Sequence, residues 1–245
     1  MEKLTVIESI KMLFGAYMNY CEAVETINQS GVYEYKKFRK PNFPSELSEQ
    51  FVYLLLNKKQ GLDCKWDKKT PGDIDIIDDD DKIKKDEVKC FSSDGPITFG
   101  PTEPWNILHL VDATEVITGN IKIYEVQMSN ISDDWKNLIL SGSDDIDYED
   151  TILDEIELNK KTKEQLKELC RKRKISGFSK YKKQELVNYL LTTKAGSGIK
   201  PIKTYQKYCD EGKRPRITPT ELLEQLGDEC HEVFNGTIDE LLKDT

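Results

Sequence analysis

The 245-residue chain has few of the side chains that build a zinc site, and it has no long apolar run. Its two histidines are His109 and His231, and its six cysteines include no Cys-x-x-Cys pair. This pattern indicates neither a structural zinc site nor a disulfide framework, so we expect reduced, mostly buried thiols. No apolar run approaches the roughly 20 residues of a membrane-spanning helix, and the first ten residues do not resemble a signal peptide. We therefore expect a soluble protein of the cytosol or nucleus, without a membrane partner.

The charge of the chain is unevenly distributed. Lysine and arginine number 36 against 45 aspartates and glutamates, a net charge of −9 that by itself argues against nucleic acid as a partner. Residues 132–155, however, carry nine acidic residues against one lysine, a net −8, whereas residues 156–194 carry twelve basic residues against four acidic ones, a net +8. Because contacts depend on local charge, the basic segment is suited to bind phosphates although the whole chain is acidic.

This change of charge also suggests how the chain is organised. We expect one core domain formed by residues 1–143 and 199–245, interrupted by an inserted module at 158–192. Residues 144–157 would be an acidic linker, and residues 193–198, with Gly196-Ser197-Gly198, a second linker.

Hydrophobic periodicity predicts the elements of the core. Helices are expected over residues 4–28 and from Ser45, and short strands at 72–77, 86–91, 107–111 and 121–126. The first helix shows one apolar stripe, formed by Val6, Ile10, Leu13, Phe14, Tyr17 and Tyr20. These elements predict the α/β (α+β) class, with a mixed sheet flanked by helices.

The first two strands form a hairpin that carries candidate catalytic residues. Alternation places Asp73 and Asp75 on one face of the first strand, and Glu87 and Lys89 on one face of the second. Carboxylates that hold Mg²⁺ can support phosphodiester hydrolysis, because the ion neutralises phosphate charge and lowers the pKa of water. A nearby lysine can stabilise the developing charge. An edge hairpin with a solvated acidic face is the alternative interpretation.

The hairpin also resembles a known family. Pro71-Gly72-Asp73 followed by Glu87-Val88-Lys89 is similar to the signature of the PD-(D/E)XK nuclease superfamily, with an additional glycine between proline and aspartate. The segments 90–105 and 213–217 resemble type II restriction endonucleases of that superfamily. The resemblance implies an α/β/α restriction-endonuclease-like core and Mg²⁺-dependent cleavage of double-stranded DNA. It further implies that Asp73 and Glu87 hold the metal while Lys89 serves the attacking water.

Such nucleases often add a glutamate from the helix before the hairpin. Glu49 is the best match here and Glu46 the second, although a glutamate near a helix N-terminus is also favoured by the helix dipole. Asp75 shares the face of Asp73 and is a further alternative ligand.

Two segments are candidates for DNA contacts outside the hairpin. Residues 92–105 form a long loop whose Ser92, Ser93, Asp94 and Thr98 suit the reading of base edges, unless it is an ordinary surface connection. Lys213, Arg214 and Arg216 could bind phosphates, or they could form a solvated surface cluster.

The basic segment predicts a small module of two helices. Thr162 to Gln165 form a capping box, and a second helix from about Tyr181 would direct Leu186, Val187, Leu190 and Leu191 inward. Lys180, Lys182 and Lys183 stand at its start. Residues 158–192 resemble the SAP domain, a DNA-binding module, which implies phosphate contacts that depend on salt but not on sequence.

Together, these patterns favour a Mg²⁺-dependent, type II restriction-like endonuclease that cuts double-stranded DNA at a short sequence. We expect a homodimer, because two DNA strands related by a two-fold axis are met most simply by two sites. The sequence leaves open whether a separate cognate DNA methyltransferase is a further partner. The alternatives are a structure-directed repair or recombination nuclease and a non-catalytic, SAP-containing DNA-binding protein.

Overall fold

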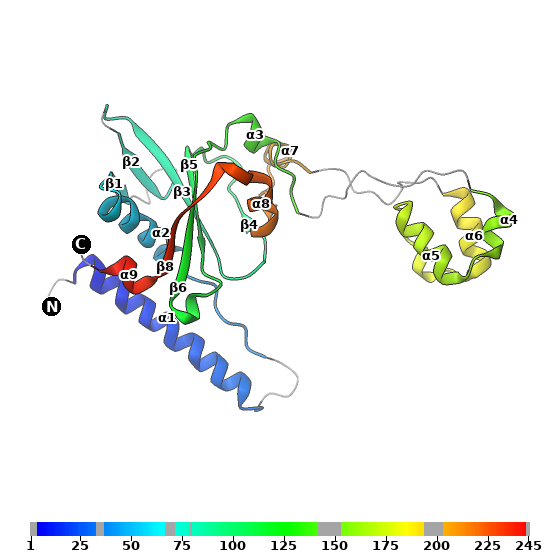
Figure 1. Ribbon diagram of the computed structural model, residues 1–245, viewed down its shortest axis with the longest axis horizontal. Coiled ribbons are helices and arrows are strands. Elements are labelled where there is room, and N and C mark those ends of the chain that lie inside the picture. Colours follow the sequence, from blue (N-terminus) through cyan, green and yellow to red (C-terminus); the bar gives the residue numbers. More distant parts are fainter. Residues whose placement is uncertain are drawn as a thin grey trace. The chain divides into compact units, whose positions relative to one another are not determined.

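A computed structural model of the chain describes residues 4–32, 37–66, 72–78, 80–141, 153–193 and 203–243 (Figure 1). The chain divides into two compact units, which are described separately. Residues 1–141 and 204–245 form the first, here called the core unit, and residues 142–203 form the second, the helical module. Pro71 and most of the expected acidic linker lie outside the described residues.

A mixed six-stranded sheet with the order β1-β2-β3-β5-β6-β8 is the centre of the core unit. Its strands are β1 (Asp63–Trp66), β2 (Ile74–Ile77), β3 (Ile83–Phe91), β5 (Ile107–Asp112), β6 (Asn120–Val126) and β8 (Cys230–Thr237). β3 and β5 are parallel, and the other neighbouring strands are antiparallel. The predicted mixed α/β architecture is therefore confirmed, and β1 and β8 extend the sheet beyond the predicted strands.

The predicted hairpin is present as β2 and β3. Ile74 lies opposite Asp86 and Ile77 opposite Ile83, so that Asp75 and Lys85 are direct cross-strand neighbours. In the turn, the carboxylate of Asp78 accepts a hydrogen bond from the backbone N–H of Lys82 at 2.9 Å. β2 pairs with β3 only as far as Asp86, so that the residues of β3 after Asp86 pair with β5 and not with β2.

Helices α1 (Val6–Gln29), α2 (Ser45–Leu54) and α9 (Ile238–Leu242) cover one face of this sheet (Figure 1). A π-helical turn, Leu55–Lys59, continues α2. Their buried side chains pack on residues of the central strands such as Ile74, Val88, Val111 and Ile123. This apolar contact fixes α2 beside β3, and so brings the residues at the start of α2 close to the hairpin.

The predicted apolar stripe of α1 is only partly correct. Ile10 and Tyr17 are buried, but Val6, Leu13 and Tyr20 are exposed, and Cys21 and Val24 are buried instead. The helix contacts the sheet along a narrow row, whereas its apolar surface extends further around the helix. Periodicity identifies the apolar side of a helix but does not fix how much of it is covered.

The other face of the sheet carries a second core that is rich in aromatic side chains. Phe99, Trp105, Trp135 and Tyr205 pack mainly edge to face, with 4.7 Å between the ring centroids of Trp105 and Trp135. Helices α3 (Asp133–Lys136), α7 (Tyr205–Asp210) and α8 (Pro219–Leu226) contribute to it. The predicted long loop enters this core through Phe99 and Trp105, which explains why it is ordered.

That loop also contains a strand, β4 (Ile97–Thr98), which pairs with β7 (Arg216–Ile217). The backbone N–H of Phe99 donates to the carbonyl oxygen of Pro215 at 3.0 Å. This small sheet places the predicted base-reading loop beside the predicted basic cluster, two segments that are far apart in sequence.

The helical module consists of α4 (Glu155–Lys160), α5 (Lys163–Lys172), the 3₁₀ turn Phe178–Lys180 and α6 (Lys183–Thr192). The predicted capping box of Thr162 and Gln165 is present. One expectation was wrong: Leu191 was expected to point inward but is exposed, while Leu190 is buried. Helix α4 begins at Glu155, within the segment expected to be the acidic linker, and places Leu158 in the small core. A module this small requires every apolar side chain that can reach its centre.

All six cysteines are free thiols. In the described ranges, no helix has the length and apolar character needed to cross a membrane.

Candidate functional site

A polar cleft of about 830 Å³ opens beside the hairpin of the core unit. Its walls come from the segment before α2, from α2 itself, from β3 with the loop that follows, and from β7. The candidate residues that line it are Glu49, Asp73, Lys89, Ser92, Ser93, Thr98 and Arg216. Side chains predicted from five separate segments therefore meet at one surface.

Asp73 is held against β3 by two hydrogen bonds. Its backbone N–H donates to the carbonyl oxygen of Asp86 at 2.8 Å, and its Oδ2 accepts from the backbone N–H of Val88 at 2.9 Å. Because β2 begins only at Ile74, the Asp73 carboxylate accepts from Val88 a hydrogen bond that the backbone of a longer β2 would otherwise accept. The carboxylate is thereby fixed at the edge of the strand that carries Glu87 and Lys89.

Gly72 explains the departure from the expected Pro-Asp motif. Its φ of +84° is in the left-handed region, and a Cβ at this position would lie 3.1 Å from the carbonyl oxygen of Asp86. Both features favour glycine. The extra glycine therefore allows the chain to turn tightly against β3 and deliver Asp73 to the strand.

Glu87 is buried beside Lys89, whose Nζ donates a hydrogen bond to the Glu87 carboxylate. Burial raises the pKa of Glu87 most, Lys89 opposes this shift, and the carboxylates of Asp73 and Glu103 raise the pKa further. Glu103 was not among the predicted residues. It comes from the long loop, where Gly100 leaves room for it: a Cβ at Gly100 would lie 2.8 Å from Glu103 Oε2. Such a set of carboxylates is stabilised by a cation.

The three further candidate acids have different environments. Glu49 is buried, lines the cleft, and accepts a hydrogen bond from Trp66 Nε1 at 2.8 Å. Glu46 is exposed and accepts a hydrogen bond from the Ser45 hydroxyl. Asp75 is paired with Lys85 at 2.5 Å. Of these positions, Glu49 is therefore the one that the fold directs to the cleft.

Asp73 and Glu87 supply two carboxylates, the type of ligand that Mg²⁺ takes from proteins. Within the described ranges, no group of three or more histidine, cysteine, aspartate or glutamate side chains is arranged to hold a metal ion. Mg²⁺ often keeps water ligands and is bound by one or two carboxylates together with substrate phosphates. Asp73 and Glu87, whose carboxylates interact electrostatically, could serve as such a pair.

The predicted DNA-contacting residues of the core unit separate into two groups. Ser92, Ser93, Thr98 and Arg216 line the cleft, and Thr98 lies opposite Arg216 in the β4–β7 pair. Asp94 instead accepts a hydrogen bond from Thr220 Oγ1 at 2.9 Å, at the start of α8.

The other two cations of the predicted basic cluster, Lys213 and Arg214, are exposed. Lys213 pairs with Glu211 at 2.5 Å, and its Nζ lies 5.4 Å from the ring centroid of Tyr208. Of the predicted basic cluster, Arg216 therefore lines the cleft, whereas Lys213 and Arg214 do not.

Arg39 and Asn42 also line the cleft, although they were not predicted. The feature of the sequence that could have indicated them is the basic segment before α2. Together with Lys89 and Arg216, Arg39 gives the cleft three cationic side chains near its carboxylates, a combination suited to a phosphate-containing ligand.

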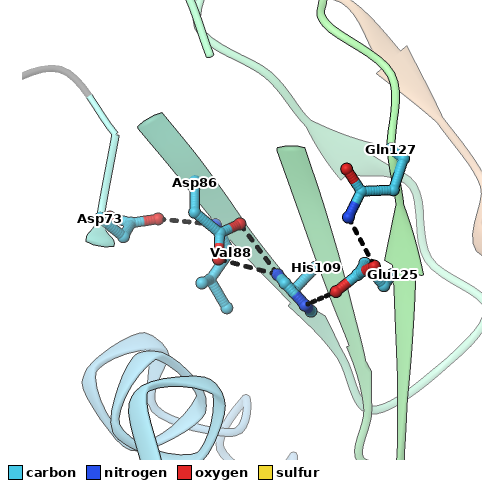
Figure 2. A network of polar contacts seen from close by, with 6 residues as sticks. All are labelled: Asp73, Asp86, Val88, His109, Glu125 and Gln127. Atoms are coloured by element: carbon cyan, nitrogen blue, oxygen red, sulfur yellow. Dashed lines mark hydrogen bonds and ion pairs between the residues drawn. The ribbon is translucent and has the colours of Figure 1, made fainter. Parts of the chain in front are cut away.

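A row of polar side chains crosses β3, β5 and β6, and its members Asp86 and His109 are fully buried (Figure 2). His109 Nδ1 lies 2.8 Å from Asp86 Oδ2, and its Nε2 lies 3.2 Å from Glu125 Oε2. Glu125 also accepts a hydrogen bond from Gln127 Nε2 at 2.7 Å. Burial alone would lower the pKa of His109, but the two carboxylates outweigh it and raise the pKa to about 9. His109 thus links β3, β5 and β6 through its contacts with the carboxylates of Asp86 and Glu125.

The sequence interpretation considered His109 only as a zinc ligand and did not find this row. The sequence feature that could have revealed the row is that two ionisable residues, Asp86 and His109, occupy strand positions that face the apolar core. Because Asp86 precedes Glu87 and accepts the backbone hydrogen bond of Asp73, the row stabilises the part of β3 that carries the site.

The predicted lysines of the helical module stand around the start of α6. Lys180, Lys182 and Lys183 are exposed. The Lys180 Nζ lies 5.3 Å from the ring centroid of Tyr181, and the Lys183 Nζ donates to the carbonyl oxygen of Asn159 at 3.0 Å. Gly177, with a φ of +79°, makes the turn before them. Lys180 and Lys182 are the more available of the three for a ligand.

Comparison with known families gives one match, to the Rho termination factor N-terminal domain over residues 157–198. The matched segment includes most of α4, all of α5 and α6, and some residues beyond the described range. It coincides with the segment in which a SAP-like module was expected. No curated protein and no solved structure matches the chain.

Proposed function

We propose that the chain is a Mg²⁺-dependent endonuclease of the PD-(D/E)XK type that cuts double-stranded DNA at a short sequence, as type II restriction enzymes do. The observation that carries this proposal is that Asp73 and Lys89 line one polar cleft, with the Asp73 carboxylate tied to β3 and the buried Glu87 carboxylate paired with Lys89. The mixed sheet with helices on both faces is compatible with the restriction-endonuclease-like core that the sequence resemblance implies.

Each polar group has a role in the proposed reaction. Asp73 and Glu87 would hold Mg²⁺, which supplies neutralisation of phosphate charge and lowers the pKa of water. Lys89, released from Glu87, would stabilise the charge that develops on the phosphate. Arg39 and Arg216 would hold the flanking DNA backbone through its phosphates.

Ser92, Ser93 and Thr98 would contact base edges from the loop that follows β3. Their short polar side chains stand on a segment that is rigid because Ile97 pairs with Ile217 and Phe99 packs among aromatic rings. Rigid placement is required for direct readout, because base-edge hydrogen bonds depend on position. This arrangement favours sequence-directed over structure-directed cleavage.

The helical module would bind nucleic acid and raise the local concentration of DNA near the core unit. The match to the Rho termination factor N-terminal domain, a nucleic-acid-binding module, supports this role. So does the net charge of +8 over residues 156–194. Contacts of this kind depend on salt and would not select the cut sequence.

Variants of the full chain test the proposal. With Mg²⁺, wild type should cut plasmid DNA, whereas Asp73→Asn and Lys89→Ala should lose about 100-fold or more of the rate and still bind DNA. Asp80→Asn, which removes an exposed carboxylate in the hairpin turn, is the matched control and should retain the rate. Discrete fragments would support sequence-directed cutting, and cleavage of flaps or junctions alone would support a repair or recombination nuclease.

A non-catalytic nucleic-acid-binding protein is the second candidate. It is favoured by the family match of the helical module and by the ion pair that Lys89 makes with Glu87. DNA binding by the wild type without cleavage in either Mg²⁺ or Mn²⁺ would select it over the nuclease.

A further inference from the structure

Helix α1 presents a row of large apolar side chains that the described part of the core unit leaves about half exposed. Val6, Leu13, Tyr20 and Ile27 follow one another at intervals of seven residues, and they are 54%, 53%, 56% and 40% exposed. The row runs along nearly the whole helix, which is about 36 Å long at 1.5 Å per residue. Single exposed apolar residues are common on protein surfaces, but a row with heptad spacing is typical of a helix that packs on another helix.

A second row, of small side chains, lies beside the first. Ser9, Ala16 and Ala23 follow Val6, Leu13 and Tyr20 by three residues each; the two alanines are exposed and the serine is half-buried. We call the two rows together the α1 face. The positions that flank it on its exposed side, Met12, Asn19 and Thr26, are uncharged.

The charges of α1 lie elsewhere on the helix. At 3.6 residues per turn, Glu8, Lys11, Glu22 and Glu25 are on the side away from the α1 face. The buried residues Ile10, Tyr17 and Val24 adjoin the face, and Ile10 and Tyr17 belong to the apolar core that α1 shares with the sheet. The α1 face is therefore an apolar surface that continues directly from the core.

We propose that the α1 face binds the α1 face of a second copy of this chain, with the two helices antiparallel about a two-fold axis. Reversing the direction of one helix brings the row of large residues opposite the row of small ones. Leu13 then packs on Ala16 of the partner subunit and Val6 on Ala23 of the partner subunit. A shift by one heptad places Tyr20 on Ala16 of the partner subunit, so that large again meets small.

This self-complementarity identifies the second copy as the occupant. Large side chains against small ones let two helices approach closely and fill the space between them, whereas a parallel pair would place large on large. The lack of charge on the face matters as well, because two copies that each carry a net −9 can meet there without opposing like charges. A basic or acidic partner would find no charge complementary to its own.

The size of the face sets the expected strength of association. A strip along one helix is smaller than the roughly 800 Å² per partner of a standard interface, so we expect a dissociation constant on the order of micromolar. This inference concerns α1 alone and does not rest on the proposed nuclease function.

Sedimentation equilibrium of the full chain tests the proposal without DNA or metal. Wild type should change from monomer to dimer between about 1 and 100 µM. Leu13→Glu and Tyr20→Glu, at positions already half exposed, should each weaken the dimer about tenfold or more, because a carboxylate would be buried without a partner. Ile131→Glu adds the same charge at an exposed apolar side chain outside α1 and should leave the dimer unchanged.

A further variant, Ala16→Leu, tests the antiparallel arrangement. It keeps a strong helix former on an exposed site, so the fold should be retained. It should weaken the dimer about tenfold or more, because a large side chain would then meet a large one in either register. A wild type that stays monomeric, a dimer that survives Leu13→Glu and Tyr20→Glu, or a dimer strengthened by Ala16→Leu would each overturn the proposal.

Discussion

The carboxylate of Asp73 accepts a hydrogen bond from the backbone N–H of Val88 at 2.9 Å. Val88 stands between Glu87 and Lys89, so this bond joins the residue that precedes β2 to the segment of β3 that carries the other two candidate groups. The position of Asp73 therefore depends on the backbone turn at Gly72 and on the stability of β3.

Replacement of Gly72 by alanine should be more destabilising than the same change at Gly119. Both glycines have a φ of +84°, but a Cβ at Gly72 would lie 3.1 Å from the Asp86 carbonyl oxygen, and one at Gly119 meets nothing within 4 Å. We expect Gly119→Ala to cost about 1 kcal/mol and Gly72→Ala about 1 kcal/mol more. Urea unfolding of both variants measures the difference, and equal losses would contradict the close contact with β3.

His109→Gln should destabilise the core unit strongly. The change leaves Asp86 buried without its cationic partner, which typically costs about 3–5 kcal/mol. His231→Gln removes the other histidine, which is exposed, and should have little effect. Chemical unfolding at pH 7 compares the two variants, and a small loss for His109→Gln would show that the buried row contributes little.

The stability of wild type should fall at alkaline pH. The pKa of His109 is raised from its ordinary value of 6.5 to about 9, so its contribution is complete below about 6.5 and is lost as the pH rises through 9. The difference in unfolding free energy between wild type and His109→Gln should therefore shrink from pH 6 to pH 10. A difference that grows over this range would contradict a charged His109 in the folded protein.

The pKa of Glu87 should respond to its neighbours in opposite directions. It is raised by burial and by the carboxylates of Asp73 and Glu103, and Lys89 opposes that rise. Glu103→Gln should therefore lower the pKa of Glu87, and Lys89→Met should raise it. Carboxyl-carbon NMR titration measures both shifts, with Glu115→Gln as a control that should leave Glu87 unchanged.

The hairpin and the sheet class could be predicted from the sequence because local alternation and apolar spacing determine them. β8 was missed because its residues are only half buried and include Asn235-Gly236, so the strand shows no clear alternation. The pairing of Thr98 with Arg216 is long-range, and no local pattern reports it. Glu103 and Arg39 reach the site region through loops, whose paths depend on the packing of the whole domain.

Lys180 and Lys182 should account for part of the affinity of the chain for DNA. Replacing both by alanine removes about two phosphate contacts, which should reduce the salt slope of duplex binding by about 1.8. Lys160→Ala, at an exposed lysine paired with Glu157, is the matched control. Fluorescence anisotropy at several salt concentrations measures the slope, and an unchanged slope would place the nucleic-acid contacts elsewhere.

The most direct test of the account is the digestion of unmethylated duplex DNA by the full chain in Mg²⁺, followed by sequencing of the ends. The account predicts ends that share one short sequence, that require the metal, and that disappear with Asp73→Asn while DNA binding persists. Intact DNA after incubation with wild type that binds it, or equal cleavage by Asp73→Asn, would contradict the assignment of Asp73, Glu87 and Lys89 as a nuclease site.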